Sequence, residues 1–298
     1  SLNLLKLFQK KIDRHFYFTI FLLLLSPLLE RWSFTDVTGN LSASLLQGNV
    51  DQNTKWRPEN RRQIFGQYVD LSTSEYGRDL IVWPEASLTF LKESIVSELT
   101  AYGKNLDDEG SGLILGIPSL TEDGYFQNTL LGIGKAEGAY IKRRLVPFGE
   151  FVPMEKHLRG IISFFDLPMS RNIPGPSVQS PLAINGKDIS SSICYEIAYP
   201  DLVRNADNDP AFILTVSNDT WFGSSIGPWQ HLQLARMRAL ENERMLIRAT
   251  NNGITAVVSS RGQVLASLPQ FTTGVLRYDL EMRSGKTPFQ RFGSWPIL

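Results

Sequence analysis

Short apolar runs alternate with segments of helical periodicity from residue 41 to residue 280, and this alternation restricts the chain to few folds. Strands that alternate with helices predict a layered α/β domain, and strands that follow one another directly predict a mixed sheet. The last three runs have no helix between them, so we expect a closing β-meander. The expected strands are 41–50, 79–85, 111–119, 125–134, 139–142, 187–196, 211–219, 254–260, 263–268 and 272–280, and the expected helices are 58–76 and 229–247.

The composition is that of a globular protein without an evident nucleic-acid partner. Hydrophobic residues make up 42% and charged residues 20% of the 298 residues, which excludes disorder along the whole chain. Lys+Arg and Asp+Glu both number 30, so no basic excess favours nucleic acid. The single cysteine, Cys194, excludes an intramolecular disulfide and a Cys-based metal cage. We therefore expect no metal, no cofactor and no nucleic acid.

The N-terminus has the features of membrane attachment. Residues 16–29 form an uncharged run of 14 residues, preceded by four basic residues between positions 6 and 14 and followed by Trp32. A spanning helix needs about 20 apolar residues, so a buried core helix or a signal peptide is the alternative. We predict a membrane-spanning or membrane-anchoring segment over 1–35. The basic flank then leaves the N-terminus in the cytoplasm and everything after residue 35 on the other side.

Two further segments have a distinct character. Residues 143–180 contain five prolines and little periodicity, which predicts a long loop region of the kind that is usually functional. Residues 282–298 end in an apolar stretch, and we expect them to form a linker into a truncated C-terminal membrane helix. The globular domain is then expected over 38–281, as one piece of a longer membrane protein.

Three ionisable residues stand at or near the ends of three expected strands. They are Glu85, Lys142 and Cys194. In open α/β sheets, reactive groups gather at the carboxyl ends of strands, so these side chains can converge on one site. Taken singly, each has an ordinary explanation, because a lone cysteine is usually an inert core residue and a lone charge is usually solvated.

Such a convergence would support acyl chemistry on the thiol. A thiol with a pKa of ~8.5 needs a base, and a desolvated Glu85 carboxylate could take its proton. The Lys142 ammonium and the backbone N–H of Tyr195 could hold the oxyanion of a tetrahedral intermediate. The rival arrangement is a Cys194/His231 pair as in papain-like enzymes, although papain-type signatures around the cysteine are absent.

The residues at these positions resemble the Glu-Lys-Cys triad of the nitrilase (carbon-nitrogen hydrolase) superfamily. The matching stretches are WPE at 83–85, the lysine at 142 and CYE at 194–196. LVPFGEFVP at 145–153 and FGSSIGPWQH at 222–231 are more specific, and they resemble the apolipoprotein N-acyltransferase family of the bacterial inner membrane. The resemblance covers most of 41–295. It implies an α/β fold, a nitrilase-like α-β-β-α sandwich with mixed sheets, here preceded by an N-terminal membrane helix.

The resemblance also implies a role for each matching residue. Glu85 matches the general base, Lys142 the oxyanion-stabilising lysine and Cys194 the nucleophile. Supporting positions are matched by Glu150, which would orient the lysine and the base, and by Trp56, Tyr195 and Glu196. Simple packing for Trp56 and a helix N-terminal acid for Glu196 are the alternatives.

The implied reaction moves a fatty acyl chain from a phospholipid to an apolipoprotein. The acceptor would be the α-amino group of an N-terminal, diacylglyceryl-modified cysteine, reached in two ping-pong steps through a Cys194 thioester. The implied location is the bacterial inner membrane with the catalytic domain on the periplasmic side. Two alternatives remain open at this point, a nitrilase-type amidohydrolase acting on a small amide and a membrane-anchored binding domain whose triad no longer acts.

Two apolar segments are candidates for a lipid entrance. Residues 161–169 and 221–229 are expected to form mobile arms over the site, because exposed apolar clusters usually mark membrane or ligand contact. The alternative is that they fill core beside the proline-rich loop. The expected entrance residues are Phe164, Phe165, Leu167, Trp221, Phe222 and Trp229.

Overall fold

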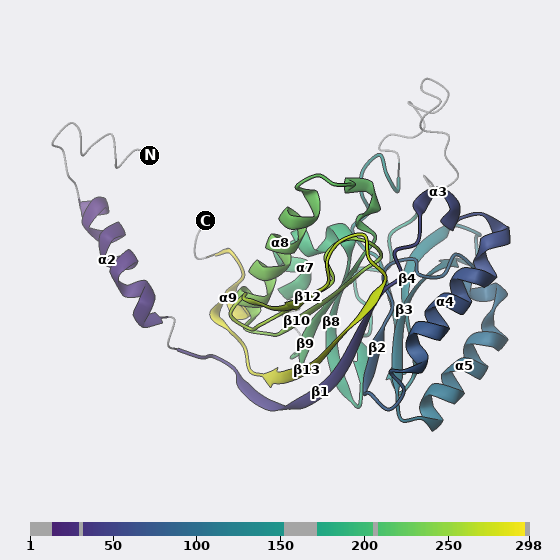
Figure 1. Cartoon of the computed structure of the whole chain (residues 1–298). Coiled ribbons are helices and arrows are strands. Elements are labelled where there is room, and N and C mark those ends of the chain that lie inside the picture. The colour runs from purple at the N-terminus through teal and green to yellow at the C-terminus, as the bar shows by residue number, and fades with distance from the viewer. Residues whose placement is uncertain (1–13, 30–31, 152–171, 205–207, 296–298) are drawn as a thin grey trace, which may run out of the picture.

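Two β-sheets pack face to face, and helices cover both outer faces of the pair (Figure 1). The computed structural model describes residues 14–29, 32–151, 172–204 and 208–295. This architecture confirms the predicted α-β-β-α sandwich with mixed sheets. The described helices are α2 (Arg14–Leu29), α3 (Gln52–Lys55), η1 (Pro58–Asn60), α4 (Arg61–Thr73), η2 (Lys92–Ser94), α5 (Val96–Asp108), η5 (Cys194–Ala198), α7 (Pro200–Arg204), η6 (Asp219–Phe222), α8 (Gly227–Asn242) and α9 (Pro288–Phe292).

The first sheet has the strand order β13-β1-β2-β3-β4-β6 within the described residues. β1, β2 and β3 run parallel to one another, and the remaining pairs are antiparallel. The bounds are β1 (Asp36–Gln47), β2 (Leu80–Val82), β3 (Gly112–Leu120), β4 (Phe126–Gly134), β6 (Ala139–Ile141) and β13 (Gly274–Ser284).

The second sheet has the order β12-β11-β10-β9-β8-β7-β5 over the same described part of the chain. β9 lies at its centre and pairs in parallel with β8 and β10, while the outer pairs are antiparallel. The bounds are β5 (Ala136–Glu137), β7 (Leu182–Ile184), β8 (Lys187–Ile193), β9 (Phe212–Ser217), β10 (Leu246–Thr250), β11 (Ala256–Val258) and β12 (Val264–Ser267).

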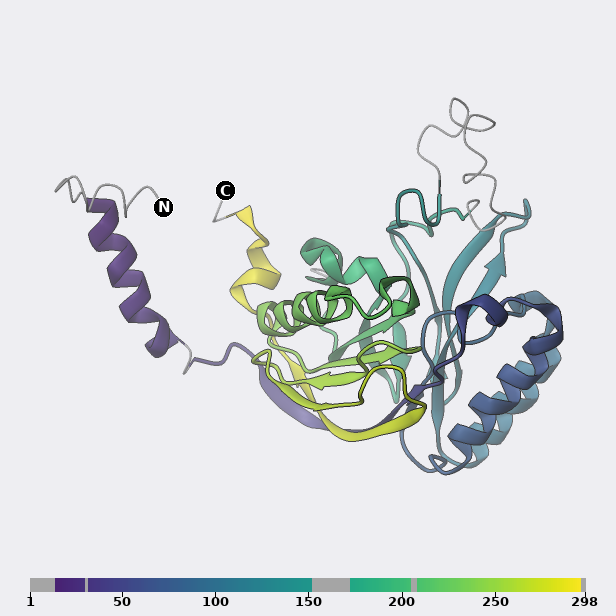
Figure 2. The same cartoon turned by 45° about the horizontal axis from the view of Figure 1, so that its top comes forward.

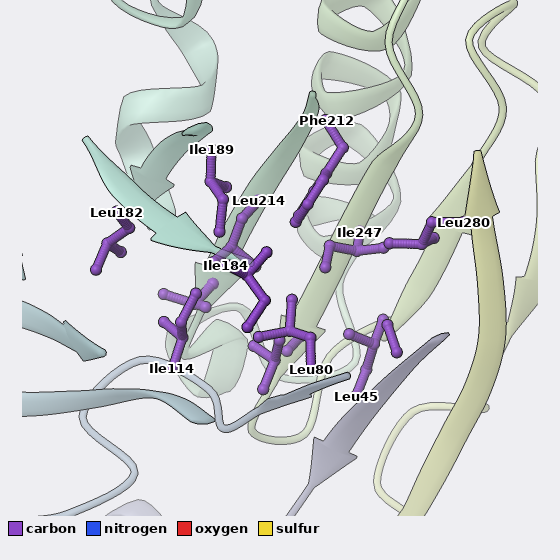
Figure 3. Close-up of a cluster of buried hydrophobic side chains, with 14 of the residues drawn as sticks. Leu45, Leu80, Ile114, Leu182, Ile184, Ile189, Phe212, Leu214, Ile247 and Leu280 are labelled. Atoms are coloured by element: carbon purple, nitrogen blue, oxygen red, sulfur yellow. The ribbon is translucent and has the colours of Figure 1, made fainter. Parts of the chain in front are cut away.

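The main core fills the space between the two sheets (Figure 3). Leu45, Leu80 and Ile114 of the first sheet face Leu214 and Ile247 of the second, and all five are buried. Burying one such side chain contributes about 1.5–3 kcal/mol as an upper estimate. The central strands are covered on both faces, which is why they appear in the sequence as continuous apolar runs rather than alternating ones.

Two smaller cores lie beneath the helices. α4 and α5 cover the first sheet, and α7 and α8 cover the second (Figures 1 and 2). α5 buries Leu99, Gly103 and Leu106, which recur at the helical spacing of one face. α8 buries Leu232 and Ala239 in the same way. The helices are therefore held by one apolar face each.

Two sequence-based expectations about the C-terminal part were wrong. The last three strands do not form a meander, because β12 pairs with β11 while β13 crosses to β1 in the other sheet. The expected helix over 229–247 ends at Asn242, where Glu243 adopts a left-handed φ of 47°, and β10 follows. β10 then pairs in parallel with β9.

The N-terminal helix α2 stands apart from the sandwich (Figures 1 and 2). It has 16 residues, and several large apolar side chains on it are exposed, among them Tyr17, Phe18 and Leu24. Over the ranges that the structure describes, no helix combines the length and the apolar character needed to cross a membrane. At the other end of the chain, β13 continues to Ser284, three residues past the expected domain end at 281, and α9 follows it.

Candidate active site

Cys194 is the first residue of η5 and directly follows the last residue of β8. Its backbone has a left-handed φ of 53°, which is rare for a residue with a Cβ atom. A conformation of this kind costs about 1–3 kcal/mol and persists only where the surroundings enforce it. The side chain is partly buried and packs against the core between the sheets. The backbone at the end of this expected strand is therefore held in a conformation that is unfavourable for a cysteine.

The structure brings Glu85 and Lys142 together at the same end of the first sheet. Lys142 Nζ lies 3.3 Å from Glu85 Oε1, and only 1% of the lysine side chain is exposed. The carboxylate also accepts a hydrogen bond of 2.8 Å from Asn128 Nδ2 and one of 2.8 Å from the backbone N–H of Asn218. Each Glu85 oxygen therefore accepts at least one hydrogen bond, which fixes the position of the carboxylate.

Glu150 contacts the same ammonium from the other side. Its Oε1 lies 2.7 Å from Lys142 Nζ, and its Oε2 accepts a hydrogen bond of 2.8 Å from the backbone N–H of Val146. The lysine is thus held between two carboxylates. This is the placement that the family resemblance implied for Glu150, and the role attached to it remains a proposal.

Electrostatics favour an ammonium on Lys142 and a protonated thiol on Cys194 in the resting site. Burial alone would lower the pKa of Lys142, but the negative charges of Glu85 and Glu150 outweigh it and raise the pKa above its usual value. Burial and the charge of Glu85 raise the pKa of the Cys194 thiol to about 12, although the Lys142 ammonium opposes this. A base must therefore remove the thiol proton during any nucleophilic attack.

Glu196 connects the two loops that carry Lys142 and Cys194. Its fully buried carboxylate accepts hydrogen bonds of 2.7 and 3.0 Å from the backbone N–H groups of Arg143 and Arg144, which follow β6. It also accepts 2.8 Å from the N–H of Ile193 and 3.0 Å from the hydroxyl of Tyr140. Glu196 therefore fixes one loop against the other.

Two further residues of the site lie on and beside α3. Lys55 is fully buried, and its Nζ has no hydrogen-bond partner in the described structure. Burial lowers the pKa of Lys55 to about 8, an effect that the negative charge of Glu85 partly opposes. Trp56 follows the helix, and its buried Nε1 also lacks an acceptor there. Tyr195 is 36% exposed, and its ring meets that of Tyr199 edge to face at 5.1 Å.

His231 contacts the backbone of Cys194. Its Nε2 lies 2.9 Å from the Cys194 carbonyl oxygen, and its Nδ1 lies 3.1 Å from Asp219 Oδ1. Asp219 Oδ2 is in turn 2.6 Å from Arg248 Nη2, and both of these side chains are buried. The alternative of a papain-like Cys194/His231 pair gains no support, because that pair requires contact with the thiol. The sequence analysis did not single out Asp219 and Arg248. Arg248 lies 17 positions from His231 and 29 positions from Asp219, and no local sequence pattern links residues so far apart.

The expected entrance residues are only partly within the described structure. Trp221, Phe222 and Trp229 are 76%, 41% and 58% exposed, so they do not fill core. The other three, Phe164, Phe165 and Leu167, lie outside the described residues. Among the residues described, no group of three or more His, Cys, Asp or Glu side chains could hold a metal ion.

Comparison with known proteins identifies the family. The model of the carbon-nitrogen hydrolase family matches residues 42–287, which includes both sheets apart from the first half of β1 and every described residue of the candidate site. This chain belongs to the carbon-nitrogen hydrolase family. The predicted resemblance to this family is confirmed.

Curated relatives narrow the resemblance within the carbon-nitrogen hydrolases. The apolipoprotein N-acyltransferase of Vibrio vulnificus is 46% identical over 268 residues, covering 85% of this chain and 52% of the relative. That of Pseudomonas syringae pv. tomato is 43% identical over 286 residues, covering 93% of this chain and 56% of the relative. The chain therefore spans about half the length of the curated relatives it matches.

Solved structures show the same fold at low sequence identity. Nit3 of Saccharomyces cerevisiae, a member of the nitrilase superfamily, has a TM-score of 0.61 at 17% identity, covering 82% of this chain and 91% of that chain. A nitrilase-superfamily amidase of Nesterenkonia has a TM-score of 0.60 at 20% identity, covering 84% and 94%. The carbon-nitrogen hydrolase fold is thus shared with hydrolases as well.

Proposed function

We propose that this chain carries the acyl-transfer domain of an apolipoprotein N-acyltransferase. The observation that supports the proposal is the 3.3 Å contact between Lys142 and Glu85, whose charges both act on the Cys194 thiol, in a chain 43–46% identical to proteins of that name. The donor is a phospholipid, and the acceptor is an apolipoprotein whose N-terminal cysteine carries a diacylglyceryl group. The reaction uses no metal and no cofactor.

The first step transfers the acyl chain to the enzyme. Glu85 takes the proton of the Cys194 thiol, and the sulfur attacks the ester carbonyl of the phospholipid. The oxyanion is held by the Lys142 ammonium and the backbone N–H of Tyr195. The carbon–oxygen ester bond then breaks, Glu85 returns the proton to the departing oxygen, and the lysophospholipid leaves a thioester on Cys194.

The second step passes the acyl chain to the amine of the acceptor. The uncharged amine attacks the thioester, the carbon–nitrogen bond forms and the carbon–sulfur bond breaks. Glu85 takes a proton from the amine and delivers it to the Cys194 sulfur. A thioester suits this step because an amine attacks it more readily than an oxygen ester, and an apolar surrounding limits competition from water.

Membrane attachment follows from the substrates and from the surface of the chain. The exposed apolar side chains of α2 and of Trp221 and Trp229 support contact with lipid. Residues 1–35 form a membrane segment, 38–281 the catalytic domain and 282–298 a linker into a C-terminal membrane helix. The domain faces the periplasm from the inner membrane.

Mass spectrometry after incubation with phospholipid alone tests the proposal. The folded chain in a lipid bilayer is expected to gain the mass of one acyl chain at Cys194, and hydroxylamine is expected to remove it. Cys194→Ala should gain nothing. Cys194→Ser is expected to hold the chain as an oxygen ester that it cannot pass on.

The acceptor step separates the proposal from the hydrolase alternative. When a diacylglyceryl-modified peptide with a free N-terminus is added, the acyl mass is expected to move from Cys194 to that peptide. Acyl loss to water at an unchanged rate, with no acylated peptide, would indicate an amidohydrolase or esterase. A folded protein that acylates the peptide without ever gaining the mass would disprove the covalent mechanism.

A further inference from the structure

We infer that His231 is a positioning residue for the oxyanion site, because it holds the peptide group that joins Cys194 to Tyr195. The inference rests on the proposed function and deepens it. In that proposal the N–H of Tyr195 stabilises the oxyanion, and the structure shows what fixes the direction of this N–H. His231 lies on α8, and in the proposed mechanism this helix contributes no group to the chemistry itself.

The contact defines the hydrogen on the imidazole. His231 Nε2 lies 2.9 Å from the carbonyl oxygen of Cys194, and a carbonyl oxygen can only accept. His231 Nε2 therefore carries a hydrogen and donates it. Nδ1 is free to take either role, because it lies 3.1 Å from Asp219 Oδ1 and 3.0 Å from Arg248 Nη2.

The planar peptide transmits this contact to the oxyanion donor. The carbonyl of Cys194 and the N–H of Tyr195 belong to one trans peptide group and point in opposite directions. Fixing the carbonyl therefore fixes the N–H. A hydrogen bond to the carbonyl also polarises the peptide group and strengthens its N–H as a donor. Without it, the left-handed φ of 53° at Cys194 would lose one of the contacts that enforce it.

Buried charges hold the imidazole in place. Asp219 is paired with Arg248 at 2.6 Å, and the hydroxyl of Ser217 donates to Asp219 Oδ1 at 2.5 Å. Burial alone would raise the pKa of Asp219, but the charge of Arg248 and the hydrogen bond with His231 hold that pKa well below its usual range. The ring of Phe222 also packs edge to face against the imidazole at 6.1 Å. His231 is thus fixed by contacts that include neither the thiol nor Glu85.

Two reactions of the same thiol separate this role from simple structural support. Acylation by p-nitrophenyl butyrate forms an oxyanion, whereas alkylation by iodoacetamide does not. We expect His231→Leu to acylate about 10- to 100-fold more slowly than the wild type, somewhat less than the ~10²–10³ for losing an oxyanion donor outright. Its alkylation rate should stay within about twofold. His231→Gln keeps an amide donor near the position of Nε2 and should recover most of the acylation rate.

The control is Gln233→Leu, which places the same side chain on the exposed face of α8 and should change neither rate. A folded His231→Leu that acylates at the wild-type rate would overturn the inference. Equal losses of acylation and alkylation in both His231 variants would also overturn it, because they would indicate a general structural role. If the wild type forms the thioester but passes it to no amine, the proposed transfer fails while the pattern among the variants still supports the positioning role.

Discussion

Lys55 is the residue whose burial is hardest to explain by stability alone. A fully buried ammonium without a hydrogen-bond partner destabilises a fold, and this one lies close enough to Glu85 to interact with its charge. α3, which carries Lys55, is joined to the loop after β9 by a hydrogen bond of 2.8 Å from Asn218 Nδ2 to Gln52 Oε1. The same Asn218 binds Glu85 through its backbone N–H. The amine therefore belongs to the surroundings of the proposed base.

Replacing this amine by an apolar side chain is expected to stabilise the protein. Its pKa falls from 10.5 to about 8 on burial, so Lys55→Met should raise the free energy of unfolding by about 3 kcal/mol at pH 7, at about 1.4 kcal/mol per pKa unit. Between pH 8 and 10.5 the unfolded chain binds a proton that the folded chain does not, so wild-type stability rises with pH there. The gain should therefore shrink toward pH 10.5. Urea unfolding at pH 7 and pH 10 measures both values, and an equal gain at the two pH values would contradict this account.

At the scale of elements, the loops after β6 and β8 depend on one carboxylate. Glu196→Gln replaces one acceptor oxygen by an amide that faces N–H or O–H donors, leaving two buried donors unpaired. Each such donor costs about 1–3 kcal/mol, so we expect a destabilisation of about 2–6 kcal/mol and a fall in acylation rate as Lys142 moves relative to Cys194. Tyr140→Phe removes only one of the donors and should cost about 1 kcal/mol. Urea unfolding of the two variants measures both losses of stability. A Glu196→Gln variant that is no less stable than Tyr140→Phe would show that Glu196 does not hold the two loops together.

The sequence predicted elements better than it predicted their partners. Most strands were recognisable because they are buried on both faces and appear as apolar runs, β9 being the clearest example. The helical spacing over 229–247 predicts a helix that includes the first two residues of β10, since a short apolar run suits either structure. The pairing of β13 with β1 joins segments more than 200 residues apart, and no local pattern encodes it. Glu85, Lys142 and Cys194 could be found from strand ends, whereas the contact of His231 with a backbone carbonyl exists only in the folded chain.

At the scale of the whole molecule, the site straddles the sandwich. Glu85 and Lys142 follow strands of the first sheet, and Cys194 follows a strand of the second. The core between the sheets, with Leu80 and Leu214 among its members, therefore sets the distance between the proposed base and the proposed nucleophile. The buried carboxylate of Glu196 also connects the loop after β6 with the end of β8, through hydrogen bonds. Core packing and the hydrogen bonds of Glu196 therefore both fix the position of Cys194 relative to Lys142.

The orientation of the whole domain relative to the membrane gives the last prediction. Four basic residues precede the apolar run 16–29, which makes up most of α2, and basic residues favour the cytoplasmic side, so the sandwich should lie in the periplasm. Protease added to intact spheroplasts that express the chain is expected to degrade the domain while a cytoplasmic marker protein survives. Exchanging the four basic residues for glutamine should weaken this preference and increase the protected fraction. Full protection of the wild-type domain until the membrane is lysed would place it in the cytoplasm and exclude access to a periplasmic acceptor.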